Sequence, residues 1–186
     1  MRIQQTELPG LLLLTPQRFG DARGYFEETW NKRGLSAAGL EAEFVQDNHS
    51  LSVRAGTLRG LHAQAPPHAQ AKLVRCTQGA IYDVAVDVRQ GSPGFGRWTA
   101  AELTPENGLQ LFLPAGFLHG YLTLRPDTQV QYKCTAYYEP AADLAVRWDS
   151  LGISWPLAGA PQLSDKDAAA VPFSSFNSPF LYEGEP

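Results

Sequence analysis

The chain has 186 residues, of which 44% are hydrophobic and 18% charged, a composition that predicts one globular domain spanning residues 1–186. Its net charge of −4 and pI near 5.5 argue against nucleic acid as a partner, because a phosphate backbone requires a basic face. Two cysteines and a first apolar run of only Leu11–Leu14 predict a cytoplasmic protein with no membrane partner.

Short apolar runs, separated by 17 glycines and 14 prolines, predict many strands and few helices. In chain order, the predicted strands are Leu11–Pro16, Tyr25–Trp30, Phe44–Val53, Thr57–Gln64, Lys72–Thr77, Ala80–Val88, Arg97–Leu103, Leu109–Pro114, Gly120–Leu124, Gln129–Tyr138 and Leu144–Trp148. Helices are predicted at Lys32–Gly39 and at Asp165–Ala170, where Ser164 would cap the helix. The turn pairs Gln78-Gly79 and Pro126-Asp127 each predict a hairpin between their flanking strands.

Two of these strands alternate between apolar and polar residues, which places successive side chains on opposite faces. In the first, Asp83 and Asp87 lie opposite an apolar face made of Ala80, Tyr82, Val84, Val86 and Val88. In the second, Gln131 and Lys133 lie opposite Val130, Tyr132, Cys134, Ala136 and Tyr138. Many evenly spaced short strands in one domain predict an all-β sandwich or barrel, and a jelly roll fits their number.

Two motifs resemble the paired motifs of cupins, which are small jelly-roll barrels. The second motif is Pro-x-Gly-x-x-His, ending at His119, and the first contains His62. Metal-binding cupins carry another histidine and a glutamate in the first motif, where this chain has Gln64 and Lys72. A cation in that position repels a divalent metal, so we expect a metal-free pocket that works by general acid–base chemistry with no cofactor.

Further motifs follow one another along nearly the whole chain. They are FGDARGYFEETW (19–30), QDNHS (46–50), GTLRGLH (56–62), QAKLVRC (70–76), DVAVDVR (83–89), SPGFGRW (92–98), PAGFLHG (114–120), YKC (132–134) and LSDKD (163–167). In this order and spacing the chain resembles the dTDP-4-dehydrorhamnose 3,5-epimerase family. The resemblance implies a homodimeric cupin-type jelly roll, with its few short helices in the N-terminal third and near the C-terminus, that inverts C3 and C5 of dTDP-4-dehydro-6-deoxy-D-glucose.

The resemblance implies a catalytic set whose residue types suit this reaction. His62 is the expected base, because imidazole titrates near neutral pH, and Lys72 would stabilise the enolate oxygen. Inversion needs a proton from the other face of the sugar, and Tyr132 is the expected acid. Asp167 resembles the aspartate that orients the histidine, although Asp165 is a rival for that role.

The same resemblance implies a dTDP-binding set. Arg23 and Arg59 would contact the diphosphate through their guanidinium groups. The remaining expected substrate contacts are Glu28, Gln46 and Asn48 for base and ribose, Tyr138 for the pyrimidine, and His119, Asp143 and Lys166 along the site. Part of the set, including Arg23 and Glu28, is expected to reach across a dimer interface.

Two departures from regular pattern affect the expected pocket. Arg59 lies three residues before His62, so regular alternation would put them on opposite faces, and we expect a bulge near Gly60 or a place for Arg59 at the barrel lip. Ala63 stands where an aromatic residue is usual, and Asp143 where glutamate is common. The first change is expected to leave room beside the base, which bears on C3-versus-C5 preference.

Other interpretations stay open from sequence alone. One is a single-site epimerase acting on C3 or C5 of a related dTDP-4-keto-6-deoxysugar. A second is a metal-dependent cupin, and a third is a non-catalytic sugar-nucleotide binder. For single residues, His62 without its motif would be read as an ordinary buried or surface histidine, Lys72 as a solvated lysine, and Tyr132 as a core tyrosine.

Overall fold

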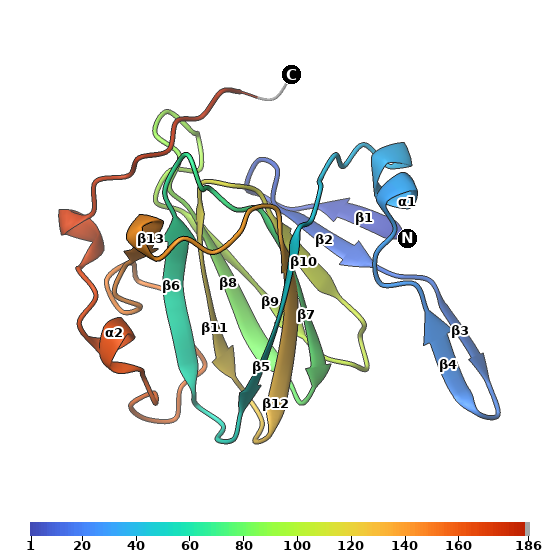
Figure 1. Ribbon diagram of the computed structural model, residues 1–186. Coiled ribbons are helices and arrows are strands. Elements are labelled where there is room, and N and C mark those ends of the chain that lie inside the picture. Colours follow the sequence, from blue (N-terminus) through green and yellow to red (C-terminus); the bar gives the residue numbers. More distant parts are fainter. Residues whose placement is uncertain (185–186) are drawn as a thin grey trace.

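A computed structural model describes residues 1–184, which form two facing β-sheets and a projecting arm (Figure 1). One sheet has six strands in the order β1-β2-β10-β7-β12-β5, and the other has five in the order β13-β6-β11-β8-β9. The arm is a two-stranded hairpin of β3 and β4 that extends away from both sheets (Figure 1). The core lies between the sheets, where Val74 and Val130 of one meet Ile81 and Ala85 of the other.

The strands are short, as the frequent glycines and prolines predicted. Their bounds are β1 Arg2–Gln5, β2 Leu12–Thr15, β3 Arg18–Asp21, β4 Gly24–Glu27, β5 Gln46–Ser52, β6 Leu58–Gln64, β7 Lys72–Gln78, β8 Ile81–Asp87, β9 Trp98–Leu103, β10 Gln110–Leu113, β11 Phe117–Thr123, β12 Thr128–Cys134 and β13 Asp143–Ala145. The helices α1 (Lys32–Ala37) and α2 (Asp165–Ala168) confirm both helix predictions, and Ser164 caps α2 as expected. No helix within residues 1–184 is long and apolar enough to cross a membrane.

The predicted all-β jelly roll is confirmed, but both predicted hairpins are wrong. β7 pairs with β10 and β12, whereas β8 pairs with β11 and β9, so the turn at Gln78-Gly79 carries the chain from one sheet to the other. The turn at Pro126-Asp127 likewise joins β11 of one sheet to β12 of the other. Such sheet-switching turns close a sandwich, and short-range turn signals do not distinguish them from hairpins.

Differences in strand bounds follow from exposure. β1 and β3 were not predicted, because Arg2–Gln5 and Arg18–Asp21 are largely exposed and carry no buried apolar alternation. β12 ends at Cys134 rather than at Tyr138, and Tyr138 lies beyond the strand with 56% of its surface exposed. β11 begins at Phe117, three residues earlier than predicted.

The five-stranded sheet is buried on both faces. Val84, Val86 and Val88 point outward into a second apolar cluster that includes Val146 and Phe180 of the C-terminal segment. The alternation predicted for β8 is therefore confirmed, but its polar side faces the barrel interior and Asp83 is fully buried there. A strand with both faces covered gives no sequence signal for which face is inside.

Ala63 also packs its side chain into this outer cluster, opposite Leu144 of β13. Alternation along β6 directs it away from the face that carries His62. Ala63 nevertheless also borders a cavity that His62 lines, so the expectation that its small side chain leaves room beside the base stays a prediction.

Candidate active site

Two adjoining cavities lie between the sheets. The first has a volume of about 440 Å³ and includes Arg59, His119 and Asp167 in its lining. The second has a volume of about 260 Å³, and its lining includes five more predicted substrate residues: Gln46, Asn48, Tyr138, Asp143 and Lys166. Arg23 and Glu28 line neither cavity. The residues that border both cavities are His62, Lys72 and Tyr132, so the three side chains predicted to act on the sugar lie together where the cavities meet.

His62 enters the cavity from β6 and is held by a buried aspartate. Its Nε2 lies 2.5 Å from Oδ1 of Asp167, and Asp167 is 3% exposed. Burial acts to raise the pKa of Asp167, but the hydrogen bond and charge of His62, with donors from Ser164 and Gly60, outweigh it and hold the pKa below its usual value. Asp165 is exposed, so Asp167 is the aspartate that contacts His62.

Lys72 and Tyr132 enter from the opposite sheet. They lie on the neighbouring strands β7 and β12, with the Lys72 Nζ 5.8 Å from the centroid of the Tyr132 ring. Burial lowers the pKa of Lys72, opposed by the nearby Cys134, Asp143 and Asp83. Burial also raises the pKa of Tyr132 to about 12, so the phenol stays protonated at neutral pH.

A second histidine–aspartate pair faces the first. His119 on β11 is the register partner of His62 on β6, and its Nε2 lies 2.7 Å from Oδ1 of Asp83. Both residues are buried, and Oδ2 of Asp83 has no hydrogen-bond partner among residues 1–184. Asp83 was not predicted as a site residue, because both faces of β8 are covered and the sequence does not indicate which face is inside.

A bulge brings Arg59 and His62 to the same cavity, as expected. His62 pairs with His119 and Arg59 pairs with Tyr121, so three steps along β6 match two along β11. The extra residue lies around Gly60, whose φ is +113°. Arg59 then reaches the first cavity, where its Nε donates to Ser52 and its Nη2 donates to the Leu51 carbonyl.

Alanine at Gly60 is expected to lower the free energy of unfolding by about 2–3 kcal/mol, because a Cβ requires backbone to move in a packed interior. That Cβ would lie 2.6 Å from both Gly120 Cα and the His119 carbonyl oxygen. Denaturant unfolding measures the effect. Gly56→Ala is the matched control, because Gly56 also has positive φ but no atom within 4 Å of an added Cβ; equal losses in the two variants would contradict the bulge's packing role.

The second cavity collects residues predicted for the nucleotide. Gln46 and Asn48 lie on β5 and are hydrogen bonded to each other, and Tyr138 lies at the rim. Lys166 and Asp143 form an ion pair beside them. The shorter carboxylate of Asp143 is thus paired with Lys166 of the LSDKD motif, which begins at Leu163.

Arg23 and Glu28 are not brought to these cavities. Arg23 lies at the tip of the β3–β4 arm with 90% of its side chain exposed, paired with Asp21. Glu28 follows the arm and accepts a hydrogen bond from Asn31. Within one chain, neither Arg23 nor Glu28 lines a cavity that contains the catalytic set. Their expected contribution across a dimer interface stays a prediction.

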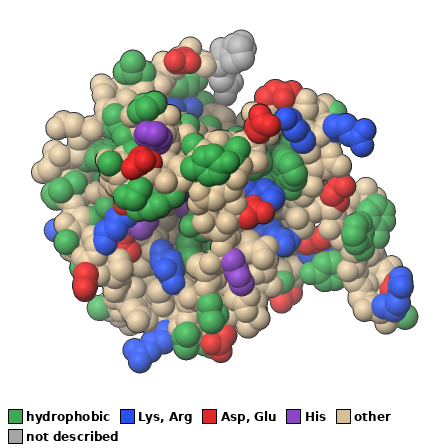
Figure 2. All heavy atoms as spheres, viewed as in Figure 1, with side chains coloured by type: hydrophobic (Ala, Val, Ile, Leu, Met, Phe, Trp, Pro, Cys, Tyr) green, Lys and Arg blue, Asp and Glu red, His purple; other side chains and the backbone are tan. Residues whose placement is uncertain are grey.

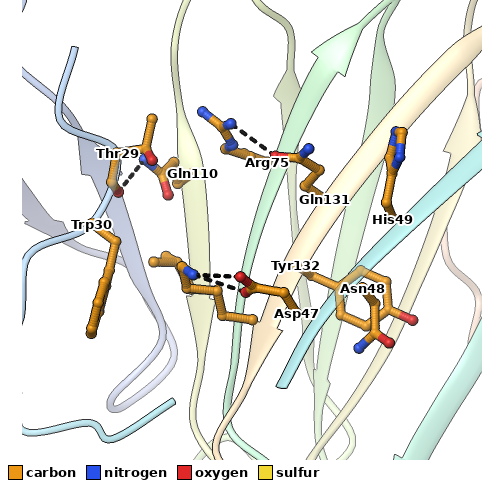
Figure 3. Close-up of a pocket in the computed structure, with 11 residues that line it drawn as sticks. Thr29, Trp30, Asp47, Asn48, His49, Arg75, Gln110, Gln131 and Tyr132 are labelled. Atoms are coloured by element: carbon orange, nitrogen blue, oxygen red, sulfur yellow. Dashed lines mark hydrogen bonds and ion pairs between the residues drawn. The ribbon is translucent and has the colours of Figure 1, made fainter. Parts of the chain in front are cut away.

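Another cavity, of about 220 Å³, lies on the outer face of the six-stranded sheet (Figure 3). Its cations are already engaged: Lys133 pairs with Asp47 at 2.8 Å, and Arg75 donates to Gln131. Figure 3 shows Arg75 and Gln131 linked across two neighbouring strands. Its lysine is paired with an aspartate and its arginine with an amide, and its lining includes neither His62 nor Lys72.

No three His, Cys, Asp or Glu side chains within residues 1–184 come together as a metal-binding group. Lys72 lies beside His62 in the cavity, and Gln64 is used for backbone hydrogen bonds. The metal-free, cofactor-free pocket stays a prediction that this donor set favours.

Fold and cavities together define a cupin-type jelly roll whose interior cleft carries acid–base side chains. The family model described as dTDP-4-dehydrorhamnose 3,5-epimerase matches residues 5–175. The chain belongs to this family, as the motifs predicted.

Relatives and solved structures agree over nearly the full length. A dTDP-4-dehydrorhamnose 3,5-epimerase from Sinorhizobium fredii is 46% identical over 184 residues, covering 98% of this chain and 94% of the relative. The Legionella pneumophila epimerase in complex with dTDP-4-keto-L-rhamnose is 40% identical with a TM-score of 0.92, covering 98% of this chain and 99% of that chain. A 3'-monoepimerase from Streptomyces bikiniensis, in complex with dTDP-quinovose, is 35% identical with a TM-score of 0.85, covering 91% and 86%.

Proposed function

We propose that the chain catalyses cofactor-free epimerisation of dTDP-4-dehydro-6-deoxy-D-glucose at C3 and C5, giving dTDP-4-dehydro-L-rhamnose. One observation carries the proposal: His62 and Tyr132 come from opposite sheets and border the same two cavities. A sugar ring between them presents one face to a base and the other to an acid. Inversion at carbon requires this opposed arrangement.

In the proposed mechanism, His62 removes the proton from a carbon next to the C4 ketone. The electron pair moves onto the ketone oxygen, and the Lys72 ammonium stabilises the resulting enolate. Tyr132 then gives its proton to the carbon from the opposite face, and solvent restores both residues. Asp167 stabilises the imidazolium, and its lowered pKa supports this role because it stays ionised near neutral pH.

The nucleotide half of the substrate would lie in the second cavity. Asn48 and Gln46 offer amide groups to base and ribose, Tyr138 offers a ring face, and Lys166 offers a cation. Arg59 is directed into the first cavity by the bulge and suits the diphosphate. His119 would contact the substrate beside His62, with Asp83 behind it.

We also propose a homodimer in which the arm completes the partner's site. Phe19, Tyr25 and Phe26 on the arm are 54–70% exposed, which is unusual for aromatic residues on a projecting hairpin in water. The apolar side chains of this arm are visible in Figure 2. A second copy packed on them would bury this surface and bring Arg23 and Glu28 near a cleft that lacks them.

Mixing two inactive variants tests this arrangement. Arg23→Ala and His62→Asn chains, unfolded and refolded together, are expected to regain about a quarter of wild-type activity, because half of the dimers then contain one intact site. Steady-state activity of the mixture against each variant alone is the measurement. If Arg23 serves its own chain's site, the mixture stays inactive.

We propose that residues 1–186 act as a single domain in the cytoplasm. The apolar cluster between the sheets and the one on the outer face of the five-stranded sheet both draw on distant parts of the chain, and both cysteines are free thiols.

Proton NMR of the product tests the reaction. Inversion at both carbons supports the proposal, and no inversion contradicts it. Inversion at one carbon would support the second candidate, a single-site epimerase. The sequence identities favour the first candidate, because the chain is 46% identical to the Sinorhizobium fredii 3,5-epimerase and 35% identical to the monoepimerase.

A further inference from the structure

The side chain of Gln64 makes three hydrogen bonds to backbone groups, and the proposed reaction does not explain them. It lies at the end of β6, on the same face as His62, and is 4% exposed. Its Nε2 donates to the Tyr137 carbonyl at 2.9 Å and to the His68 carbonyl at 2.5 Å, while its Oε1 accepts from the Glu139 N–H at 2.9 Å. Both amide hydrogens and the amide oxygen are therefore engaged.

Two of these bonds flank Tyr138. The Tyr137 carbonyl precedes it and the Glu139 N–H follows it, and both bind the single amide of Gln64. The Tyr138 N–H itself donates to Oε1 of Gln46 at 2.9 Å. Three backbone groups around Tyr138 are thus held by two glutamine side chains that project from β5 and β6.

Tyr138 depends on these anchors because little else holds it. Strand β12 ends at Cys134, so no sheet ladder reaches Tyr138. Its side chain is 56% exposed at the rim of the second cavity, so core packing does not fix it either. A loop residue with few buried contacts moves unless its backbone is anchored.

We propose that Gln64 is a positioning residue for nucleotide recognition, fixing the segment 137–139 so that Tyr138 forms one wall of the pyrimidine site. This inference rests on the proposed function. It also links the two ends of the substrate. His62, which would act on the sugar, and Gln64, which would position the wall of the pyrimidine site, lie two residues apart on β6. Gln64 stands where a metal-binding cupin has its second histidine, and here that position supports binding.

The experiment compares dTDP affinity and turnover in Gln64→Leu. Leucine fills a similar volume but cannot bind the three backbone groups, so we expect the Kd for dTDP and the KM to rise at least about tenfold. Turnover at saturating substrate should stay within about threefold, because His62 and Tyr132 are untouched. Gln64→Glu, which keeps the acceptor for the Glu139 N–H, provides a second variant if leucine prevents folding; we expect it to raise Kd as well.

Gln90→Leu is the matched control. Gln90 also donates its side-chain amide to a backbone carbonyl, that of Ser178, but it lines neither of the two cavities. Its loss should change the Kd for dTDP less than about twofold. A double-mutant cycle then asks whether Gln64 acts through Tyr138: in a Tyr138→Ala background, Gln64→Leu should have almost no further effect on Kd.

The possible outcomes separate the two proposals. A wild-type chain that does not bind dTDP contradicts the proposed function. A wild-type chain that binds dTDP, with unchanged affinity in Gln64→Leu, overturns the positioning role alone. Additive effects in the double mutant would also overturn it, since Gln64 would then act independently of Tyr138. A fall in kcat with KM unchanged would overturn it too, since Gln64 would then act on the position of His62 along β6 or on stability.

Discussion

Replacing His62 by asparagine is expected to lower kcat by about 1,000-fold or more, the loss typical of removing a positioned general base. Asparagine occupies a similar volume and can still accept or donate one hydrogen bond to Asp167, so the fold and the cavity should persist. The Kd for dTDP should stay within about threefold, because the proposed mechanism uses His62 at the sugar and not at the nucleotide. Calorimetric titration with dTDP and a steady-state assay measure the two quantities.

His68→Asn is the control for this change. His68 is exposed and is engaged through its backbone, because its N–H donates to the Ala65 carbonyl and its carbonyl accepts from Gln64. Its activity should match the wild type. Activity retained by His62→Asn would contradict the assignment of the base, whereas joint loss of activity and dTDP binding would indicate a general disruption of the cavity.

Replacing Lys72 by methionine is expected to lower kcat by about 100- to 1,000-fold, the range found when a donor to a developing oxyanion is removed. Methionine keeps the length and removes the charge. The folded chain should become somewhat more stable, because burial of the ammonium is unfavourable, as the lowered pKa of Lys72 indicates. Activity and denaturant unfolding together test this opposition of stability and function.

Lys32→Met controls for loss of a positive charge. Lys32 lies on α1 with an exposed side chain, paired with Glu43, and its removal should leave kcat unchanged. Bound iron, manganese or zinc in the Lys72→Met protein but not in the wild type would agree with a cation that keeps metals out. Full activity in Lys72→Met would contradict the role in enolate stabilisation.

Strand periodicity explains why the inward-facing site residues could be predicted from sequence. Lys72 shares parity with Val74 and Cys76, and Tyr132 with Val130, so burial of these neighbours fixes the direction of both side chains. His62 lay in a motif whose spacing is similar to that of cupins. The rule of alternation, combined with the family resemblance, was sufficient for residues on regular strands.

Residues whose placement depends on the sheet arrangement were harder to predict. Asp83 was read as opposite an apolar face, but that face is covered by the C-terminal segment, which alternation along β8 does not reveal. The turn at Gln78-Gly79 has the local chemistry of a hairpin, yet it crosses between sheets. In both cases the decisive contact joins residues far apart in sequence.

Tyr138 and Gln64 show a third limit. Alternation extended the strand through Tyr138, whereas the ladder ends at Cys134 and side-chain amides take over the backbone hydrogen bonds. A glutamine gives no sequence signal for the backbone groups that it will bind. Its role follows only from the loop that the fold brings beside it.

Isotope incorporation during turnover tests the central claim most directly. The enzyme is incubated with dTDP-4-dehydro-6-deoxy-D-glucose in D₂O, and deuterium at each ring carbon is read by NMR and mass spectrometry. Removal of a proton by His62 and return of a solvent-derived one by Tyr132 predict deuterium at both C3 and C5 of the product. Incorporation at only one carbon, or at neither, would contradict the double epimerisation proposed for this chain.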